Sequence, residues 1–108
     1  MRGRAFLGPT AALLLSLPPP VTAAAPRIHV VSIDKMKFGA MPAGVKAGDT
    51  IVWDNRDLFR HSATARDGSF NVDLPAGTRG KAIVRKPGAI AFTCKFHPGM
   101  RGVLRVSQ

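Results

Sequence analysis

The segment TCKFHPGMRG, residues 93–102, contains the only cysteine of the chain, and a histidine and a methionine follow it at intervals of three residues. A single cysteine cannot form an internal disulfide, so the thiol of Cys94 needs a different explanation. Side chains three positions apart point to opposite faces of a strand, whereas in a tight turn they can converge. The spacing of Cys94, His97 and Met100 therefore indicates a turn that gathers a thiol, an imidazole and a thioether.

Short apolar runs on either side of this turn predict strands. Those runs cover residues 27–33, 50–53, 81–85, 89–94 and 102–106. The segment 54–80 is polar and rich in Asp, Asn and Gly, so we expect turns and loops there. Because no stretch after the N-terminal segment has sustained helical periodicity, the pattern predicts one all-β sandwich or barrel. Gly99 and Gly102 should let the last connection bend tightly.

A second histidine, His61, lies in the polar segment, and in a sandwich its loop could share one end with the 94–101 loop. Together His61, Cys94, His97 and Met100 offer two imidazole nitrogens, a thiolate and a thioether. Two imidazoles and a thiolate in a plane, with a weak axial thioether, form the blue-copper arrangement, and soft sulfur ligands select copper. Zinc also binds cysteine and histidine, but it has no use for the methionine.

Each of these residues also has an ordinary structural interpretation. A lone cysteine is often a small buried hydrophobe, a methionine is often part of a core, and His61 could be an ordinary loop residue. The combined pattern is more specific than its members. By contrast, His29 has no partner within its predicted strand and is interpreted as a surface or edge residue, and Met36 and Met41 are interpreted as packing residues.

Two longer segments, which include several of the predicted strands and candidate ligands, resemble those of a known family. The segments KMKFGAMPAGVKAGDTIVWDN (35–55) and GAIAFTCKFHPGMRGVLRV (88–106) resemble the first strands and the ligand loop of the cupredoxins, the small type 1 blue copper proteins. The resemblance is greatest to the amicyanin, pseudoazurin and plastocyanin group. The gap of two residues between His97 and Met100 matches the short ligand loop of amicyanins.

The resemblance implies an all-β, Greek-key β-sandwich with one copper ion at one end. It implies that His61, Cys94 and His97 are the strong ligands and Met100 the axial ligand. It also implies that an exposed edge of His97 passes electrons. In many members an Asn follows the first ligand histidine and ties the two ligand loops together; Ser62 stands there, which predicts a weaker tie.

Three functions are compatible with these residues. The first is an exported mononuclear copper protein that carries single electrons between redox proteins and is not an enzyme. The alternative keeps the copper but assigns the protein to copper sequestration or delivery. The third is an enzyme with a Cys/His nucleophile, which would also need an oxyanion site and a substrate pocket. Nothing in the sequence supplies that pocket, and Met100 would then be unexplained.

The N-terminus has the layout of a secretory signal peptide. Arg2 and Arg4 precede an apolar run over residues 5–17, and small residues follow. We expect cleavage after residue 23 or 24, which leaves one domain over 24–108, exported to the periplasm. The apolar run is too short and too interrupted to be a transmembrane anchor.

The formal net charge of the chain is +10, and it contains no glutamate. This charge either forms a solvated basic surface or favours anionic partners. Arg60, Lys95 and Arg101 flank candidate ligands, so we expect them to steer an acidic redox partner and to favour Cu(I). Nucleic acid is not expected as a partner, since the chain has no nucleic-acid motif and no tyrosine. We expect a monomer.

Overall fold

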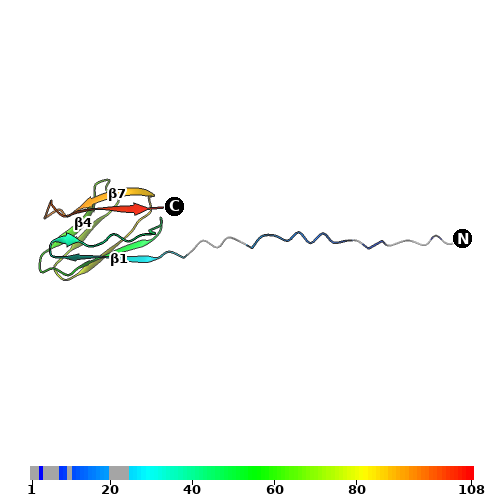
Figure 1. Cartoon of the computed structure of the whole chain (residues 1–108), viewed down its shortest axis with the longest axis horizontal. Coiled ribbons are helices and arrows are strands. Elements are labelled where there is room, and N and C mark those ends of the chain that lie inside the picture. The colour runs from blue at the N-terminus through cyan, green and yellow to red at the C-terminus, as the bar shows by residue number, and fades with distance from the viewer. Residues whose placement is uncertain (1–2, 4–7, 10, 20–24) are drawn as a thin grey trace.

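The computed structural model describes residues 3, 8–9, 11–19 and 25–108. Within these residues the chain forms eight strands: β1 (Ile28–Asp34), β2 (Lys37–Phe38), β3 (Thr50–Asn55), β4 (His61–Ala65), β5 (Asn71–Leu74), β6 (Arg79–Ile83), β7 (Gly88–Thr93) and β8 (Arg101–Val106) (Figure 1). No helix in this part of the chain is long and apolar enough to cross a membrane. The expected cleavage positions lie outside the described residues.

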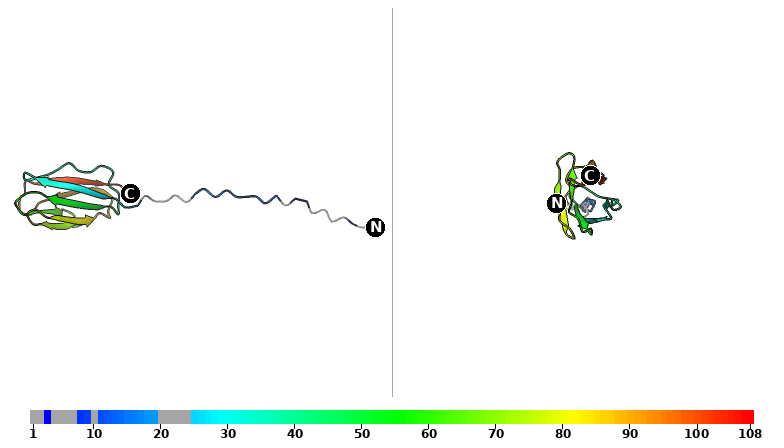
Figure 2. Two further views of the ribbon diagram at one scale, coloured as in Figure 1. Left: turned by 90° about the horizontal axis from the view of Figure 1, so that it is seen from below. Right: turned by 90° about the vertical axis from the view of Figure 1, so that its left-hand side faces the viewer.

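The strands form two four-stranded sheets, in the orders β2-β1-β3-β6 and β5-β4-β7-β8 (Figure 2). The chain changes sheet after β3, after β5 and after β6. Strands β1 and β3 run parallel, in register from Ile28 opposite Thr50 to Ile33 opposite Asn55. The other strand pairs are antiparallel. The expected all-β sandwich is confirmed.

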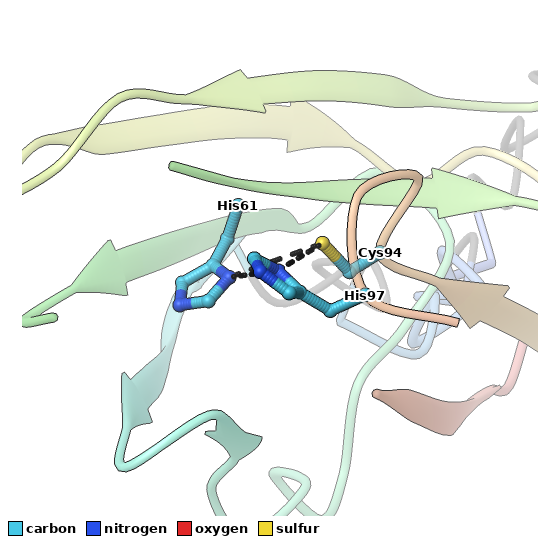
Figure 3. Close-up of side chains that lie close together, drawn as sticks. All are labelled: His61, Cys94 and His97. Carbon is cyan, nitrogen blue, oxygen red and sulfur yellow. Dashed lines mark hydrogen bonds between the residues drawn. The ribbon is translucent and has the colours of Figure 1, made fainter. Parts of the chain in front are cut away.

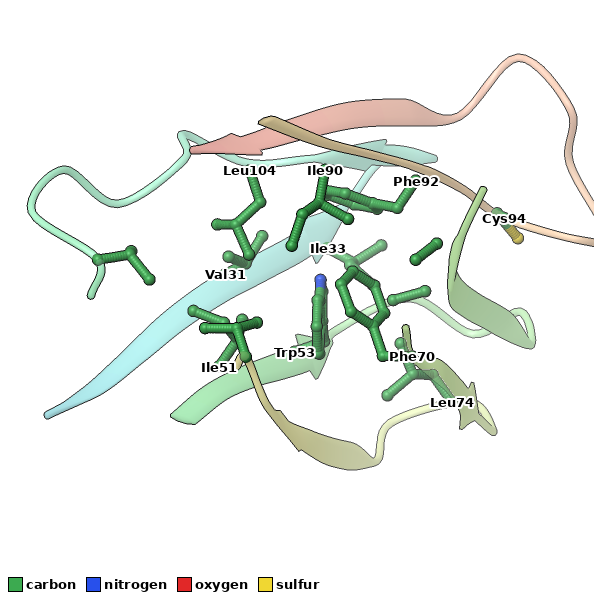
Figure 4. Packing of buried hydrophobic residues seen from close by; sticks show 14 of the residues in the cluster. Val31, Ile33, Ile51, Trp53, Phe70, Leu74, Ile90, Phe92, Cys94 and Leu104 are labelled. Carbon is green, nitrogen blue, oxygen red and sulfur yellow. The ribbon is translucent and has the colours of Figure 1, made fainter. Parts of the chain in front are cut away.

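The core lies between the sheets because alternate residues of each strand point inward. In β3, Ile51 and Trp53 are buried while their neighbours are partly exposed. The Trp53 ring lies 5.0 Å from the Phe70 ring and 6.1 Å from the Phe92 ring, measured between centroids. Cys94 lies at one edge of the drawn cluster (Figure 4). One end of the hydrophobic core therefore borders the candidate ligands.

The predicted strands agree with β1, β3, β7 and β8 to within about two residues, and β6 begins two residues earlier than expected. The interpretation of 54–80 as turns and loops is wrong in part, because it contains β4 and β5. β4 has the sequence HSATA, whose small and polar side chains carry little strand signal. Its pairing with β5 and β7 nevertheless buries four of its five residues.

The expected role of the two glycines of the last connection also needs correction. Neither Gly99 nor Gly102 has the positive φ that only glycine adopts readily. Gly102 is needed for a close approach instead, because a Cβ atom there would lie 2.6 Å from the Phe92 ring. A Cβ at Gly99 would meet nothing within 4 Å. The turn is therefore shaped by its hydrogen bonds and not by glycine flexibility.

Candidate metal centre

The connection between β7 and β8 is a closed turn. Cys94 directly follows β7, and Met100 directly precedes β8. The Cys94 N–H donates to the Met100 carbonyl at 3.0 Å, and the Met100 N–H donates to the His97 carbonyl at 2.8 Å. These bonds continue the β7–β8 pairing into the turn and fold residues 94–100 back on themselves. The turn thereby brings Cys94 and His97 to one point, as their spacing predicts.

The third candidate ligand comes from β4, the strand that pairs with β7 in the same sheet. His61 is the first residue of β4, is opposite Leu74 of β5, and is fully buried. Its Nδ1 atom lies 3.1 Å from Nδ1 of His97 and 3.9 Å from Sγ of Cys94. The Cys94 Sγ to His97 Nδ1 distance is 3.6 Å (Figure 3). Three donor atoms, one from the start of β4 and two from the β7–β8 turn, thus face one another.

These spacings fit one shared metal ion. With metal–nitrogen bonds of about 2.0 Å and a metal–sulfur bond of about 2.3 Å, donors on a trigonal plane lie about 3.5 Å (N to N) and about 3.7 Å (S to N) apart. The observed 3.1, 3.6 and 3.9 Å scatter around these values. Met100 is buried beside Cys94 through the backbone bond described above. The thiol of Cys94, the imidazoles of His61 and His97, and the thioether that Met100 contributes from the same turn as Cys94 are together a donor set that suits a soft transition-metal ion.

The centre is shielded from solvent on one side and accessible on the other. His61 and Cys94 are buried, whereas His97 is partly exposed. The two ligand-bearing loops expose apolar side chains, Leu58 at 91% and Phe96 at 48% of their surface. The Arg60 guanidinium lies 5.8 Å from the Phe96 ring centre, so it bridges these loops. His97 is therefore the candidate ligand that lies nearest the solvent.

Sequence reasoning missed Asp57. Its Oδ2 atom lies 2.8 Å from Nε2 of His61, the ring nitrogen that faces away from Cys94. Burial favours a higher pKa for Asp57, but hydrogen bonds from the Met36 N–H, the His61 ring and the Lys35 N–H outweigh it and hold this pKa below its usual value. The only sequence signal is an aspartate four residues before the histidine, and that spacing is not specific.

Ser62 connects the two ligand segments. It is fully buried, and its Oγ atom accepts a hydrogen bond from the Lys95 N–H at 2.9 Å. The Ser62 hydroxyl also lies 3.0 Å from the hydroxyl of Thr64. A tie between the two ligand segments is therefore present, and it is the hydrogen bond from the Lys95 N–H, one residue after Cys94, to the serine hydroxyl.

His29 has no partner within its own strand, as predicted, but its side chain is only 12% exposed, so the interpretation as a surface residue is wrong. Its Nε2 atom lies 2.8 Å from Oδ2 of Asp49, which is buried. The parallel pairing of β1 with β3 explains this contact, since it places the first residues of β1 beside the residue that precedes β3. Met36 and Met41 do pack against the core, as expected.

Comparison with known proteins agrees with this geometry. No protein-family model matches the chain. Amicyanin of Paracoccus denitrificans is 33% identical over 88 residues, covering 68% of this chain and 60% of that protein. Amicyanin of Paracoccus versutus is 32% identical over 79 residues, with the same coverage. The chain thus spans about 60% of the length of these curated relatives.

Solved structures give the same result. The crystal structure of the Paracoccus versutus amicyanin matches with a TM-score of 0.63 and 27% identity, over 74% of this chain and 81% of that one. The Cu(I) form of an amicyanin variant matches with a TM-score of 0.65 and 29% identity, over 78% and 86%. The chain is therefore similar to the amicyanins in both sequence and fold.

Proposed function

We propose that this chain is an exported, mononuclear type 1 copper protein that carries single electrons between redox proteins and is not an enzyme. The Nδ1 atoms of His61 and His97 and the thiolate of Cys94 are its strong ligands, and the thioether of Met100 is the axial ligand. The observation that carries this proposal is the convergence of three donor atoms within 4.8 Å of one another at the end of an amicyanin-like sandwich.

Bound copper would supply a one-electron Cu(I)/Cu(II) couple. The protein contributes a rigid set of donors. The hydrogen bonds that close the turn hold Cys94 and Met100, and burial of His61 and Cys94 excludes water from that side. Donors that do not move between oxidation states keep the reorganisation small. A buried Cys94 also disfavours the nucleophilic enzyme, because a substrate could not reach its sulfur atom.

Electrons enter and leave through His97 in this proposal. Its ring is partly exposed, and Pro98, Phe96 and Leu58 in the ligand loops are exposed apolar residues on which a partner can settle. Arg60 and Lys95 add positive charge beside them. We therefore expect an acidic redox partner, with an electron-transfer rate that falls as ionic strength rises. A rate independent of salt would contradict this part of the proposal.

The export signal and the strand connectivity complete the proposal. Residues 1–23 form a signal peptide, cleavage follows residue 23 or 24, and the mature Greek-key domain over 24–108 is released to the periplasm as a monomer. Two observations support this division. The sandwich begins at Ile28, and residues 11–19 carry exposed leucines outside it. Mass spectrometry of the exported protein gives the cleavage position.

The test is addition of Cu(II) to the purified mature protein. An intense blue band, from charge transfer between the Cys94 thiolate and copper, should appear and should be absent in Cys94→Ala. A colourless protein that binds only zinc would overturn the proposal. The alternative of copper delivery predicts that copper leaves for a partner during repeated oxidation and reduction, whereas a carrier keeps its copper through many cycles.

A further inference from the structure

The imidazole of His61 has a partner on each side. Its Nδ1 atom faces Cys94 and His97, and its Nε2 atom lies 2.8 Å from Oδ2 of Asp57. The side chain of His61 is 0% exposed and that of Asp57 is 10% exposed. The pair is therefore a contact between a carboxylate and a candidate metal ligand that is almost inaccessible to solvent. It lies on the side of the imidazole ring that faces away from the centre.

This contact determines which nitrogen of His61 is free. A carboxylate can only accept hydrogen bonds, so Nε2 must carry the proton that is shared with Asp57. In a neutral imidazole the other nitrogen, Nδ1, then has a free lone pair. That nitrogen is the one aimed at Cys94 and His97. The tautomer required of a metal ligand is thus selected before any metal arrives.

The carboxylate of Asp57 is itself held in place by the β1–β2 turn, whose two residues have positive φ angles. The Lys35 N–H donates to Oδ1 of Asp57 at 2.8 Å, and the Met36 N–H donates to Oδ2 at 3.0 Å. Lys35 and Met36 lie between β1 and β2 with φ of 51° and 62°, a conformation uncommon outside glycine. Such a conformation persists where surrounding contacts determine it. Here it directs two successive N–H groups at one carboxylate.

A second support comes from Asn55, at the end of β3. Its Oδ1 atom accepts the N–H of Asp57 at 3.0 Å, and its amide donates to the carbonyls of Phe59 at 2.8 Å and Leu74 at 3.0 Å. Asn55 is buried. The loop that carries Asp57 is therefore fastened to β5 as well as to the β1–β2 turn.

We propose that Asp57 is a positioning residue of the metal centre, which fixes the tautomer of His61 and places a largely buried negative charge one imidazole ring away from the ion. This inference rests on the proposed copper function for its effect on potential, but not for the tautomer. The charge stabilises Cu(II) more than Cu(I), so it lowers the reduction potential. It opposes the effect of Arg60 and Lys95, whose exposed charges are screened by water and salt.

Two substitutions separate the charge from the hydrogen bond. In Asp57→Asn the amide oxygen can still accept the proton on Nε2 of His61, so the tautomer is kept while the charge is lost. In Asp57→Ala both are lost. Asp49→Asn is the matched control, because Asp49 also accepts two backbone N–H groups and the Nε2 of a histidine, His29, away from the metal centre.

The first measurement is the reduction potential of the copper-loaded proteins. Asp57→Asn should keep the blue band and weaken Cu(II) relative to Cu(I) by about tenfold, within the range for the loss of a partner of a metal-bound histidine. This corresponds to an increase of about 59 mV for one electron. Asp49→Asn should leave the potential unchanged. Equal shifts in the two variants would overturn the proposal, since the charge would then act without regard to position.

The second measurement does not depend on copper. In the metal-free protein, nitrogen NMR of the histidine rings should show His61 with its proton on Nε2 in the parent and in Asp57→Asn. In Asp57→Ala the proton should be distributed over both nitrogens. An unchanged Nε2 tautomer in folded Asp57→Ala would overturn the proposal. Failure of the parent to turn blue would instead reject the copper function, and the NMR result would still decide the role of Asp57.

Discussion

The strand β3 has an aspartate beyond each end, and each aspartate binds a histidine. Before β3, Asp49 accepts the N–H groups of Arg27 and Lys46 and lies 2.8 Å from Nε2 of His29. After β3, Asp57 has the same set of partners, two backbone N–H groups and the Nε2 atom of His61. The two carboxylate–histidine pairs are alike in geometry and lie at opposite ends of the paired strands β1 and β3.

The difference between the pairs lies on the far side of the imidazole. Nδ1 of His61 faces the Cys94 sulfur and a second imidazole, and these three residues form the group that could hold a metal within the described part of the chain. His29 lies outside that group and fastens the start of β1 to the residue before β3. A carboxylate that orients a histidine is thus a structural feature of both pairs. The groups beside the other ring nitrogen determine whether that histidine can bind a metal.

The largest effect should come from removal of each histidine in turn. His61→Ala should lose the blue band completely, because it removes one of the three proposed strong ligands, whereas His29→Ala should retain the full band and one copper per chain. Absorption spectra and metal analysis of the folded variants give the answer. Loss of colour in His29→Ala would mean that the two pairs do not differ as described.

Copper should also stabilise the folded protein, and this gain should require His61 but not His29. A ligand that binds only the folded state adds about 4 kcal/mol when its free concentration is about 1,000 times the dissociation constant. We expect a gain of this size in the parent and in His29→Ala, and little gain in His61→Ala. Urea unfolding with and without copper measures it. A similar gain in all three proteins would indicate binding outside the centre.

The hydrogen bonds of Asp49 should make the free energy of unfolding depend on pH in the acid range. Hydrogen bonds from the N–H groups of Arg27 and Lys46, and then from His29, lower the pKa of Asp49 from 3.8 to about 2. Because the folded-state pKa lies below the unfolded one, this stabilisation is complete above about pH 4 and is lost as the pH falls toward 2.

In that pH range the urea midpoint of Asp49→Asn should change less than that of the parent. The comparison is made on metal-free protein, so that release of copper in acid does not contribute. Parallel pH profiles for the two proteins would show that Asp49 is not the group responsible.

The smallest effect should come from the tie between the ligand segments. Ser62→Ala removes the acceptor of the Lys95 N–H and should cost about 1 kcal/mol of unfolding free energy. Thr64→Ala is the control, because it removes the Ser62–Thr64 contact and the bond to Asn71 but keeps the bond from the Lys95 N–H. Urea denaturation of both metal-free variants separates the two contacts. Equal losses would show that the bond across the ligand segments adds nothing of its own.

Local patterns in the sequence predicted the features that depend on neighbouring residues. Cys94, His97 and Met100 are close in the sequence, and a single hydrogen-bonded turn contains all three. The strands rich in β-branched residues were predicted because branched side chains pack well on the pleated surface of a sheet. His61 could be proposed from its residue type and its place in a polar loop, before its distance from Cys94 was known.

The features that sequence could not predict depend on distant segments. Nothing about residues 61–65 indicates a strand until β5 and β7 pair with it. His29 meets Asp49 only because β1 runs parallel to β3, although the two residues are 20 positions apart in the sequence. Asp57 acquires its role from two N–H groups whose directions follow from backbone angles at Lys35 and Met36.

The position of Trp53 gives the protein an internal optical signal. It is the only tryptophan, and the chain has no tyrosine. Its indole is buried against Phe70 and Phe92, and within the described residues its Nε1 atom has no hydrogen-bond partner. An indole in such apolar surroundings emits at short wavelength, and the emission moves to long wavelength when water reaches the ring. The fluorescence of the native chain therefore comes from one residue in the centre of the sandwich and can follow its unfolding without a label.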